Sequence, residues 1–295
     1  MSVLVKSSGS VGKVTIDGET VKRNLNLVSF LTNESVSDLP YPFNYAGCVE
    51  FNNEIHILGS GESGHQQKHY KLDGVSWVSV STLPVVGYGG RAVVYNGDIH
   101  FLGTASENYQ KSHYKWNGSE WVSASTLPYN FYHGSAVVCD GEIHILGGSG
   151  GGTKHYKWNG TTWTSVSTLP YSFDNASAVT FNGEIHILGG NGSYSTNHYK
   201  WNGSSWVSVS TLPYMFKYGT VVVFKENIYI LGGSSQASAC YKWDGSTWKS
   251  VTTLPFDFSA GHAIVDNNVV HILGSESNGY ETNHYRIFVP YYKEI

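Results

Sequence analysis

The chain has few charged residues and no excess of basic ones. Charged side chains make up 14% of its 295 residues, and the formal net charge is −4. A surface that binds nucleic acid needs a basic excess to displace counterions from the phosphates. Because the 18 Lys and Arg are spread thinly along the chain, we expect no nucleic-acid partner.

Cysteines and long hydrophobic runs are also scarce. The three cysteines, Cys48, Cys139 and Cys240, occupy unrelated positions in the repeat described below, so they cannot form a repeated disulfide framework. No apolar run is long enough to cross a bilayer, and the N-terminus carries neither an apolar segment nor a signal-peptide cleavage site. These absences predict a soluble protein that is made in the cytoplasm and does not insert into membranes.

What the sequence does contain is a repeat. Leu-Pro dipeptides begin at Leu39, Leu83, Leu127, Leu169, Leu212 and Leu254, with spacings of 44, 44, 42, 43 and 42 residues. In five copies a Tyr precedes a Trp by seven residues: Tyr70 and Trp77, Tyr114 and Trp121, Tyr156 and Trp163, Tyr199 and Trp206, Tyr241 and Trp248. A period of this length, filled by strand-like segments and turn dipeptides, predicts a ring of small sheets.

The third copy shows how one unit folds. Within Gly134 to Pro170, Asp140-Gly141 separates two β-branched runs, which is the strongest short signal for a hairpin because both turn residues need positive φ. Asn159-Gly160 separates two further alternating strands. Each unit is therefore predicted to be a meander of four antiparallel strands, named a to d in chain order. Because one meander cannot bury both faces, six units should close into an all-β, six-bladed β-propeller.

From Leu25 to Tyr285 the chain resembles the kelch-repeat family, in the glycine pair after strand b, the Tyr of strand c and the Trp of strand d. The pair is complete in three copies, as Gly147-Gly148, Gly189-Gly190 and Gly232-Gly233, whereas the other copies keep one glycine, Gly59, Gly103 or Gly274. The last copy has no strand-d Trp, so we expect the segment from Leu27 to Val36 to supply its fourth strand and close the ring. This assigns residues 1–24 to an N-terminal extension, with a hairpin at Asp17-Gly18, and residues 25–295 to the propeller.

Histidine and tryptophan also follow the repeat. Five His occupy strand b (His56, His100, His144, His186, His271) and five precede the strand-c Tyr (His69, His113, His155, His198, His284). Since Tyr229 and Cys240 replace this pair in one copy without a compensating ligand, we expect structural histidines hydrogen-bonded between blades, and no metal or other cofactor. Trp116, Trp158, Trp201 and Trp243 follow the strand-c Tyr by two residues. They could either hold a sugar ring or pair with the strand-d Trp.

The copies differ mainly on one predicted face. Because the strands alternate in direction, the d-a and b-c loops open on one side of the disc and the a-b and c-d turns on the other. The turns are nearly invariant, while the loops vary and are rich in Tyr, Asn, Ser and Gly, as in surfaces that bind through adaptable hydrogen bonds. The predicted ligand-binding residues are Asn44, Tyr45, Tyr88, Arg91, Tyr132, His133, Asp174, Asn175, Lys217, Tyr218, His262, Tyr109, Tyr194 and Tyr280. Free drift of tolerant loops is the competing explanation.

These observations favour a binding propeller without catalytic activity, whose partner is a cell-surface saccharide or protein. The leader resembles attachment segments of bacteriophage tail proteins, which implies a host-recognition component carried on a virion, with residues 1–24 joining a homo-oligomer or larger assembly. Two alternatives stay open. One is a carbohydrate-active enzyme similar to the sugar mutarotases or oxidases among kelch-like propellers, although no nucleophile with its base and no metal cluster is evident. The other is a structural or oligomer-forming disc.

Overall fold

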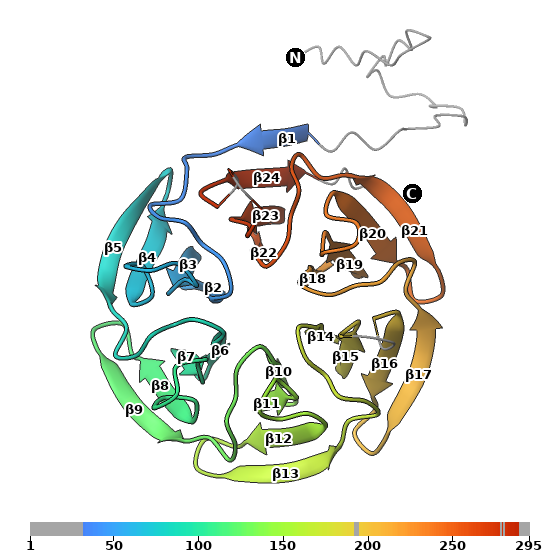
Figure 1. Ribbon diagram of the computed structural model, residues 1–295, viewed down its shortest axis with the longest axis horizontal. Helices are drawn as coiled ribbons and strands as arrows, with labels where there is room; N and C mark the ends of the chain where they lie inside the picture. Colours follow the sequence, from blue (N-terminus) through green and yellow to red (C-terminus); the bar gives the residue numbers. More distant parts are fainter. Residues whose placement is uncertain (1–31, 192–194, 278, 280, 289–295) are drawn as a thin grey trace, which may run out of the picture.

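A computed structural model describes residues 32–191, 195–277, 279 and 281–288, which form six four-stranded antiparallel sheets arranged around an axis (Figure 1). Blade 1 contains β2 (Gly47–Phe51), β3 (Glu54–Leu58), β4 (Lys68–Asp73) and β5 (Ser76–Thr82). Blade 2 contains β6 (Arg91–Tyr95), β7 (Asp98–Leu102), β8 (Ser112–Trp116) and β9 (Trp121–Thr126). Blade 3 contains β10 (Ser135–Cys139), β11 (Glu142–Leu146), β12 (Lys154–Trp158) and β13 (Trp163–Thr168).

The remaining blades continue the ring. Blade 4 contains β14 (Ser177–Phe181), β15 (Glu184–Leu188), β16 (Asn197–Trp201) and β17 (Trp206–Thr211). Blade 5 contains β18 (Thr220–Phe224), β19 (Asn227–Leu231), β20 (Ala239–Trp243) and β21 (Trp248–Thr253). Blade 6 contains β22 (His262–Asp266), β23 (Val269–Leu273), β24 (His284–Phe288) and β1 (Thr32–Ser35). The predicted six-bladed propeller is confirmed.

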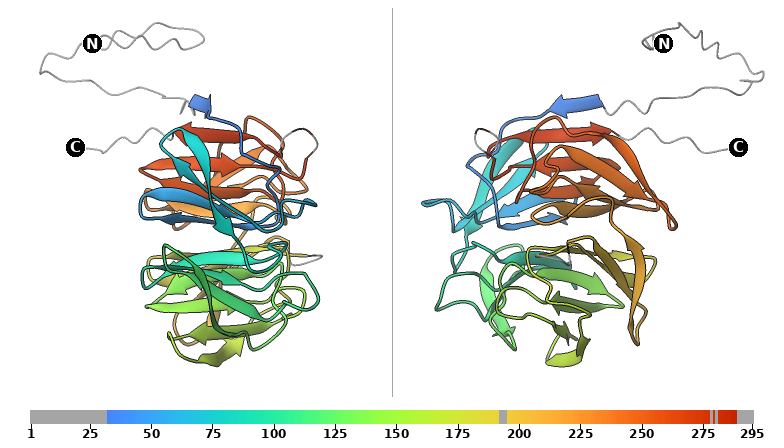
Figure 2. Two further views of the ribbon diagram at one scale, coloured as in Figure 1. Left: turned by 90° about the vertical axis from the view of Figure 1, so that its left-hand side faces the viewer. Right: turned by 45° about the vertical axis from the view of Figure 1, so that its right-hand side comes forward.

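An N-terminal strand closes the ring, as the sequence predicted. β1 pairs antiparallel with β24, with Thr32 opposite Phe288 and Ser35 opposite Tyr285. Figure 2 shows β1 alongside β24 at the outer edge of the disc. The proposed extension, residues 1–24, lies outside the described residues. Blade 6 is thus held together by strands from the two ends of the chain.

The tight a-b hairpins form for the predicted reason. Both central residues have positive φ, for example Asp140 at 49° with Gly141 at 72°, and Asn96 at 49° with Gly97 at 80°. This left-handed backbone matches the twist of the strands that it joins. The innermost strands of successive blades lie around the axis, and apolar side chains pack between neighbouring blades.

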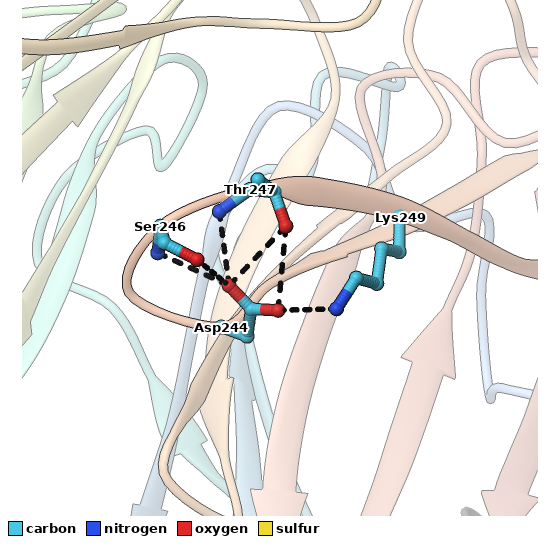
Figure 3. Close-up of polar contacts among 4 residues, drawn as sticks. All are labelled: Asp244, Ser246, Thr247 and Lys249. Atoms are coloured by element: carbon cyan, nitrogen blue, oxygen red, sulfur yellow. Dashed lines mark hydrogen bonds and ion pairs between the residues drawn. The ribbon is translucent and has the colours of Figure 1, made fainter.

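The Asn-Gly and Asp-Gly dipeptides have a different role at the c-d turns of blades 2 to 5. In blade 5, Oδ1 of Asp244 accepts hydrogen bonds from the backbone amides of Ser246 and Thr247, and Oδ2 accepts one from Lys249 Nζ (Figure 3). Hydrogen bonds from Lys249 and these amides hold the pKa of the Asp244 carboxyl well below its usual range. The first residue of the dipeptide therefore caps a four-residue turn, with the side chain satisfying the free amides.

The repeated histidines form hydrogen-bonded pairs within single blades, in every blade except blade 5, which corrects the prediction that they bond between blades. In blade 2, His100 Nδ1 lies 2.7 Å from His113 Nε2, and His113 Nδ1 lies 2.7 Å from Ser125 Oγ. The connection between blades comes from Trp163 of blade 3, whose indole N–H donates to the same Ser125 Oγ at 3.0 Å. Blades 1, 3 and 4 repeat this His–His–Ser–Trp chain.

The four Trp that follow the strand-c Tyr are interior residues. Trp116, Trp158, Trp201 and Trp243 are at most 8% exposed, and each contacts the strand-c His of the preceding blade, as Trp116 does with His69 at 5.3 Å between ring centroids. Trp116 is also opposite Trp121 across the hairpin. The sugar-plate alternative for these residues is therefore wrong, and the cross-strand pairing is confirmed.

The His–His–Ser–Trp chain gives a first prediction. The substitution Ser125→Ala removes the partner of both His113 Nδ1 and Trp163 Nε1, so a buried imidazole and a partly buried indole each lose a hydrogen bond. We expect a loss of about 2–4 kcal/mol in the free energy of unfolding, measured by urea titration. The matched control is Ser123→Ala on the same strand, where the side chain is exposed and a change below about 0.5 kcal/mol is expected. Equal effects at the two positions would contradict this interpretation.

Candidate functional site

Six backbone hydrogen bonds form a closed ring around the axis on the face that carries the variable loops. The residues involved are the fifth beyond each Leu-Pro proline: Tyr45, Gly89, His133, Asn175, Tyr218 and Ala260. Each amide donates to the carbonyl of its counterpart in the preceding loop, over 2.6 to 3.1 Å, and Tyr45 N closes the ring on Ala260 O. All six have positive φ, from 48° to 74°. The ring fixes the six d-a loops on one face.

Side chains on this ring alternate between aromatic and small, and the aromatic ones meet over the axis. Tyr45 contacts His133 at 5.6 Å and Tyr218 at 6.0 Å between ring centroids, edge to face in both cases. Tyr88, the residue before Gly89, contacts Tyr45 at 5.8 Å and His133 at 5.3 Å. We call Tyr45, Tyr88, His133 and Tyr218 the mouth cluster. Its members come from four different loops.

Next to the ring lies a cavity of about 60 Å³, lined in part by Arg91, Ser177, Thr220 and His262. These are the first residues of four innermost strands. Arg91 donates from Nη1 to the Gly90 carbonyl at 2.9 Å, and no described carboxylate forms an ion pair with it. Burial lowers the pKa of Arg91 to about 10, against the opposing effect of Asp174, so the guanidinium stays charged at neutral pH. The cavity, referred to below as the axial cavity, therefore contains a fixed positive charge.

The same charge and burial keep the neighbouring histidines neutral. Burial, followed by the proximity of Arg91, lowers the pKa of His133 to about 4 and that of His262 to about 3. Neutral imidazoles can both donate and accept hydrogen bonds. Around the axis the site thus combines aromatic rings, neutral imidazoles and one guanidinium.

Two carboxylates flank the mouth cluster. The Tyr45 hydroxyl donates to Glu276 Oε2 at 2.5 Å, and burial, followed by this bond, raises the pKa of Tyr45 well above its usual range. Asp174 accepts hydrogen bonds from Ser149 Oγ at 2.8 Å and Asn191 Nδ2 at 2.9 Å, and also one from Asn175. Burial and the two carboxylates raise the pKa of Tyr218. Both tyrosines therefore remain hydroxyl donors.

The other predicted residues fall into four groups. Asn44 is buried and braces the first b-c loop, accepting from Gly61 N and donating to Glu62, so it has a structural role. Tyr132 contacts His133, and Lys217 lies over the Tyr218 ring at 5.3 Å, so both border the mouth cluster. Tyr109 is 44% exposed on a b-c loop and has no described ring contact with the cluster. Tyr194 and Tyr280 lie outside the described residues.

Glu276 lies on a variable b-c loop but was not among the predicted ligand-binding residues, because the sequence does not show that it meets Tyr45, 231 residues away. Sequence reasoning also missed the importance of Gly89 and Ala260, whose small side chains leave room for the aromatic ones. The signal was present in the alternation of residue size at the fifth position beyond each proline. Within the described part of the chain, no cluster of three or more His, Cys, Asp or Glu could hold a metal ion. Nor does any helix in that part have the length and apolarity to cross a membrane.

The architecture and this mouth define the class: the chain is a six-bladed β-propeller of four-stranded blades. The solved structure of YjhT is similar, with a TM-score of 0.73 over 85% of this chain and 95% of that chain, at 13% sequence identity. This likeness concerns the fold. No family model matches the chain, and no curated protein does. The kelch-repeat resemblance thus rests on the repeated residues alone.

Proposed function

We propose that this propeller recognises a saccharide at the mouth of its central channel. The observation that carries the proposal is the convergence of Tyr45, Tyr88, His133 and Tyr218 from four loops onto the axis. Rigid aromatic rings with polar tips provide contact area for a sugar ring together with hydrogen bonds to its hydroxyl groups. The propeller fold does not require aromatic side chains at these positions, because Gly89 and Ala260 occupy the equivalent backbone positions in other loops.

The axial cavity completes the proposed site. Its hydroxyl and imidazole groups and the Arg91 guanidinium lie next to the cluster, where they would orient a polar substituent of the ligand. A preorganised backbone ring reduces the entropy lost on binding, since each loop is already held by its neighbours. Display on a bacteriophage tail, suggested by the leader, is the biological setting that we propose for such recognition.

The test is a glycan array with the full chain. Tyr218→Ala should weaken binding at least ten-fold, because it removes one wall of the mouth cluster; Ala260 shows that alanine fits this backbone position. Tyr88→Ala should act similarly. The control is Val75→Ala on a c-d turn of the opposite face, where the side chain is 76% exposed and binding should not change. Wild-type protein that binds no glycan, or cluster variants that bind normally, would refute the proposal.

A second candidate is a carbohydrate-active enzyme, favoured by the Tyr45–Glu276 hydrogen bond beside Arg91. The Glu276 carboxylate, held in place by the Tyr45 hydroxyl, could act as a general base that accepts a proton from a hydroxyl group of a bound sugar. Incubation of array-positive sugars with the protein, followed by NMR of the anomeric signals, separates the two functions. A ligand that is bound and left unchanged supports pure recognition. Conversion that is lost in Glu276→Gln supports catalysis.

A further inference from the structure

A second cavity, unrelated to the mouth, lies between blades 6 and 1 on the face that carries the a-b and c-d turns. Its volume is about 290 Å³, and its lining includes Ile55 and Leu72 of blade 1 with Asp266, Val269, His271 and Arg286 of blade 6. We call it the seam pocket, because these blades meet where the two ends of the chain join the ring. It does not depend on the proposed saccharide site.

The seam pocket exists because two large side chains of the repeat are replaced together. Leu72 occupies the position of Trp116, Trp158, Trp201 and Trp243 in the other complete repeats. Asp266 occupies the strand-a position that is aromatic in four of the blades, where Phe51, Tyr95, Phe181 and Phe224 stand. Between blades 4 and 5 these two positions are filled by Phe181 and Trp243, whose ring centroids lie 5.9 Å apart. At the seam, the corresponding space is open.

A third replacement leaves a cation facing this space. In blades 1 to 4, strand b begins with an acidic residue, and a strand-c Lys forms an ion pair with it, as Lys157 does with Glu142 at 2.6 Å. In blade 6 the strand-c residue is Arg286 and the acidic residue is replaced by Val269. Among the described residues, Arg286 forms no ion pair. Glu34 of β1 is opposite Arg286 in the strand register, and Arg286 also lines the pocket, where its guanidinium can meet a ligand.

Two carboxylates, Glu54 and Asp266, also line the pocket. Glu54 binds Lys71 Nζ at 2.8 Å, and Asp266 accepts from Asn267 Nδ2 at 3.0 Å. Ile55, Leu72 and Val269 supply an apolar wall. Asp266 keeps its negative charge, because Asn267 is neutral. Arg286 is the one Lys or Arg in this lining, and a planar carboxylate matches its paired donors.

We propose that the seam pocket binds a planar aromatic molecule that bears a carboxylate. Its ring takes the place of the indole found in the other blades, against Ile55, Leu72 and Val269, and its carboxylate pairs with Arg286. A volume near 300 Å³ is at the lower end for small-molecule sites, which suits a one- or two-ring compound.

Isothermal titration calorimetry tests the proposal by measuring the affinity of the full chain for indole-3-acetate and for indole. Wild-type protein should bind both, with indole-3-acetate at least ten-fold tighter. Leu72→Trp fills the pocket with the repeat's own side chain and should abolish both interactions while the protein unfolds at no lower temperature than the wild type. Arg286→Gln should remove the ten-fold preference and leave the affinity for indole unchanged.

Two further variants keep the test specific. Trp116→Leu opens the equivalent space between blades 1 and 2, where Lys71 is already paired with Glu54, so it should not create a carboxylate preference. Tyr218→Ala, at the mouth, should leave both affinities unchanged, which separates this proposal from the saccharide site. Absence of binding at millimolar concentration, or binding that survives Leu72→Trp, would overturn the seam pocket as a ligand site. An unchanged preference in Arg286→Gln would overturn the role of the guanidinium.

Discussion

Lowering the pH from 7.5 to 5.5 should reduce the free energy of unfolding by on the order of 10 kcal/mol, enough to unfold a typical domain. The cause is the set of ten buried histidines. Burial lowers the pKa of the strand-b members to about 4 (His56, His100, His144, His186, His271). It lowers the pKa of the strand-c members to about 3 (His69, His113, His155, His198, His284).

The sign of the effect follows from the direction of these shifts. In the unfolded chain histidine titrates near 6.5, so below that pH the unfolded state binds protons that the folded state does not. Stability is therefore fully present above pH 6.5 and is lost as the pH falls toward about 4. At pH 5.5 each buried neutral His costs about 1.4 kcal/mol, and the costs add over the ring. His133 and His262 act in the same direction.

Urea titrations at pH 7.5, 6.5 and 5.5 measure this dependence, and blade 5 suggests the control. Tyr229 and Cys240 occupy the His positions there, so the ring tolerates a pair that does not titrate in this range. The double variant His144→Tyr with His155→Cys should bind about two fewer protons on unfolding. The slope of its unfolding free energy against pH should therefore be lower than that of the wild type by about 2.7 kcal/mol per pH unit. Unfolding free energies that agree at pH 7.5 and 5.5 would refute the account.

The substitution Gly189→Ala should destabilise the propeller by more than about 3 kcal/mol. A Cβ at this position would lie 1.9 Å from the Phe216 carbonyl oxygen, which belongs to the backbone of the next d-a loop and cannot rotate away. That loop also carries Tyr218 of the mouth cluster. Relief of the clash requires movement between blades 4 and 5.

Gly203→Ala is the matched control. Both glycines have positive φ, 72° at Gly189 and 92° at Gly203, but a Cβ on Gly203 meets nothing within 4 Å. Its cost should be about 1 kcal/mol, from backbone conformation alone. The difference between the two variants in urea titration isolates the contact between blades. A difference below about 0.5 kcal/mol would show that the loop yields easily and that the close approach is not required.

The fold was predictable because each blade is specified locally. The Leu-Pro period gave the blade number, the Asp140-Gly141 type of turn gave the hairpins, and the missing Trp in the last copy indicated the closing strand β1. The importance of each glycine could not be foreseen. Gly189 has counterparts in all six copies, whereas the second glycine of the pair gives way to Ser60, Thr104 or Ser275, whose hydroxyls bond loop carbonyls instead. The repeats show which of the two positions is restricted, but the reason, the close approach of the next d-a loop, is visible only in the structure.

The sequence was enough to predict which face of the disc carries the candidate site, but only some of the residues that form it. Internal comparison of the repeats indicated the d-a and b-c loops, and Tyr45, His133 and Tyr218 do lie together. Asn44 varies between copies for another reason, since it braces its own loop through Gly61 and Glu62. Convergence across the axis depends on the length and closure of the backbone ring, which links residues far apart in the chain, and no local pattern encodes it.

The hydrogen-bonded ring at the mouth is made entirely of peptide groups, so its geometry does not require any particular side chain at its six positions. Tyr, Gly, His, Asn and Ala already share one conformation there. The molecule is thus a ready-made scaffold for combinatorial engineering: randomising those codons together would sample new specificities while the strands beneath stay untouched.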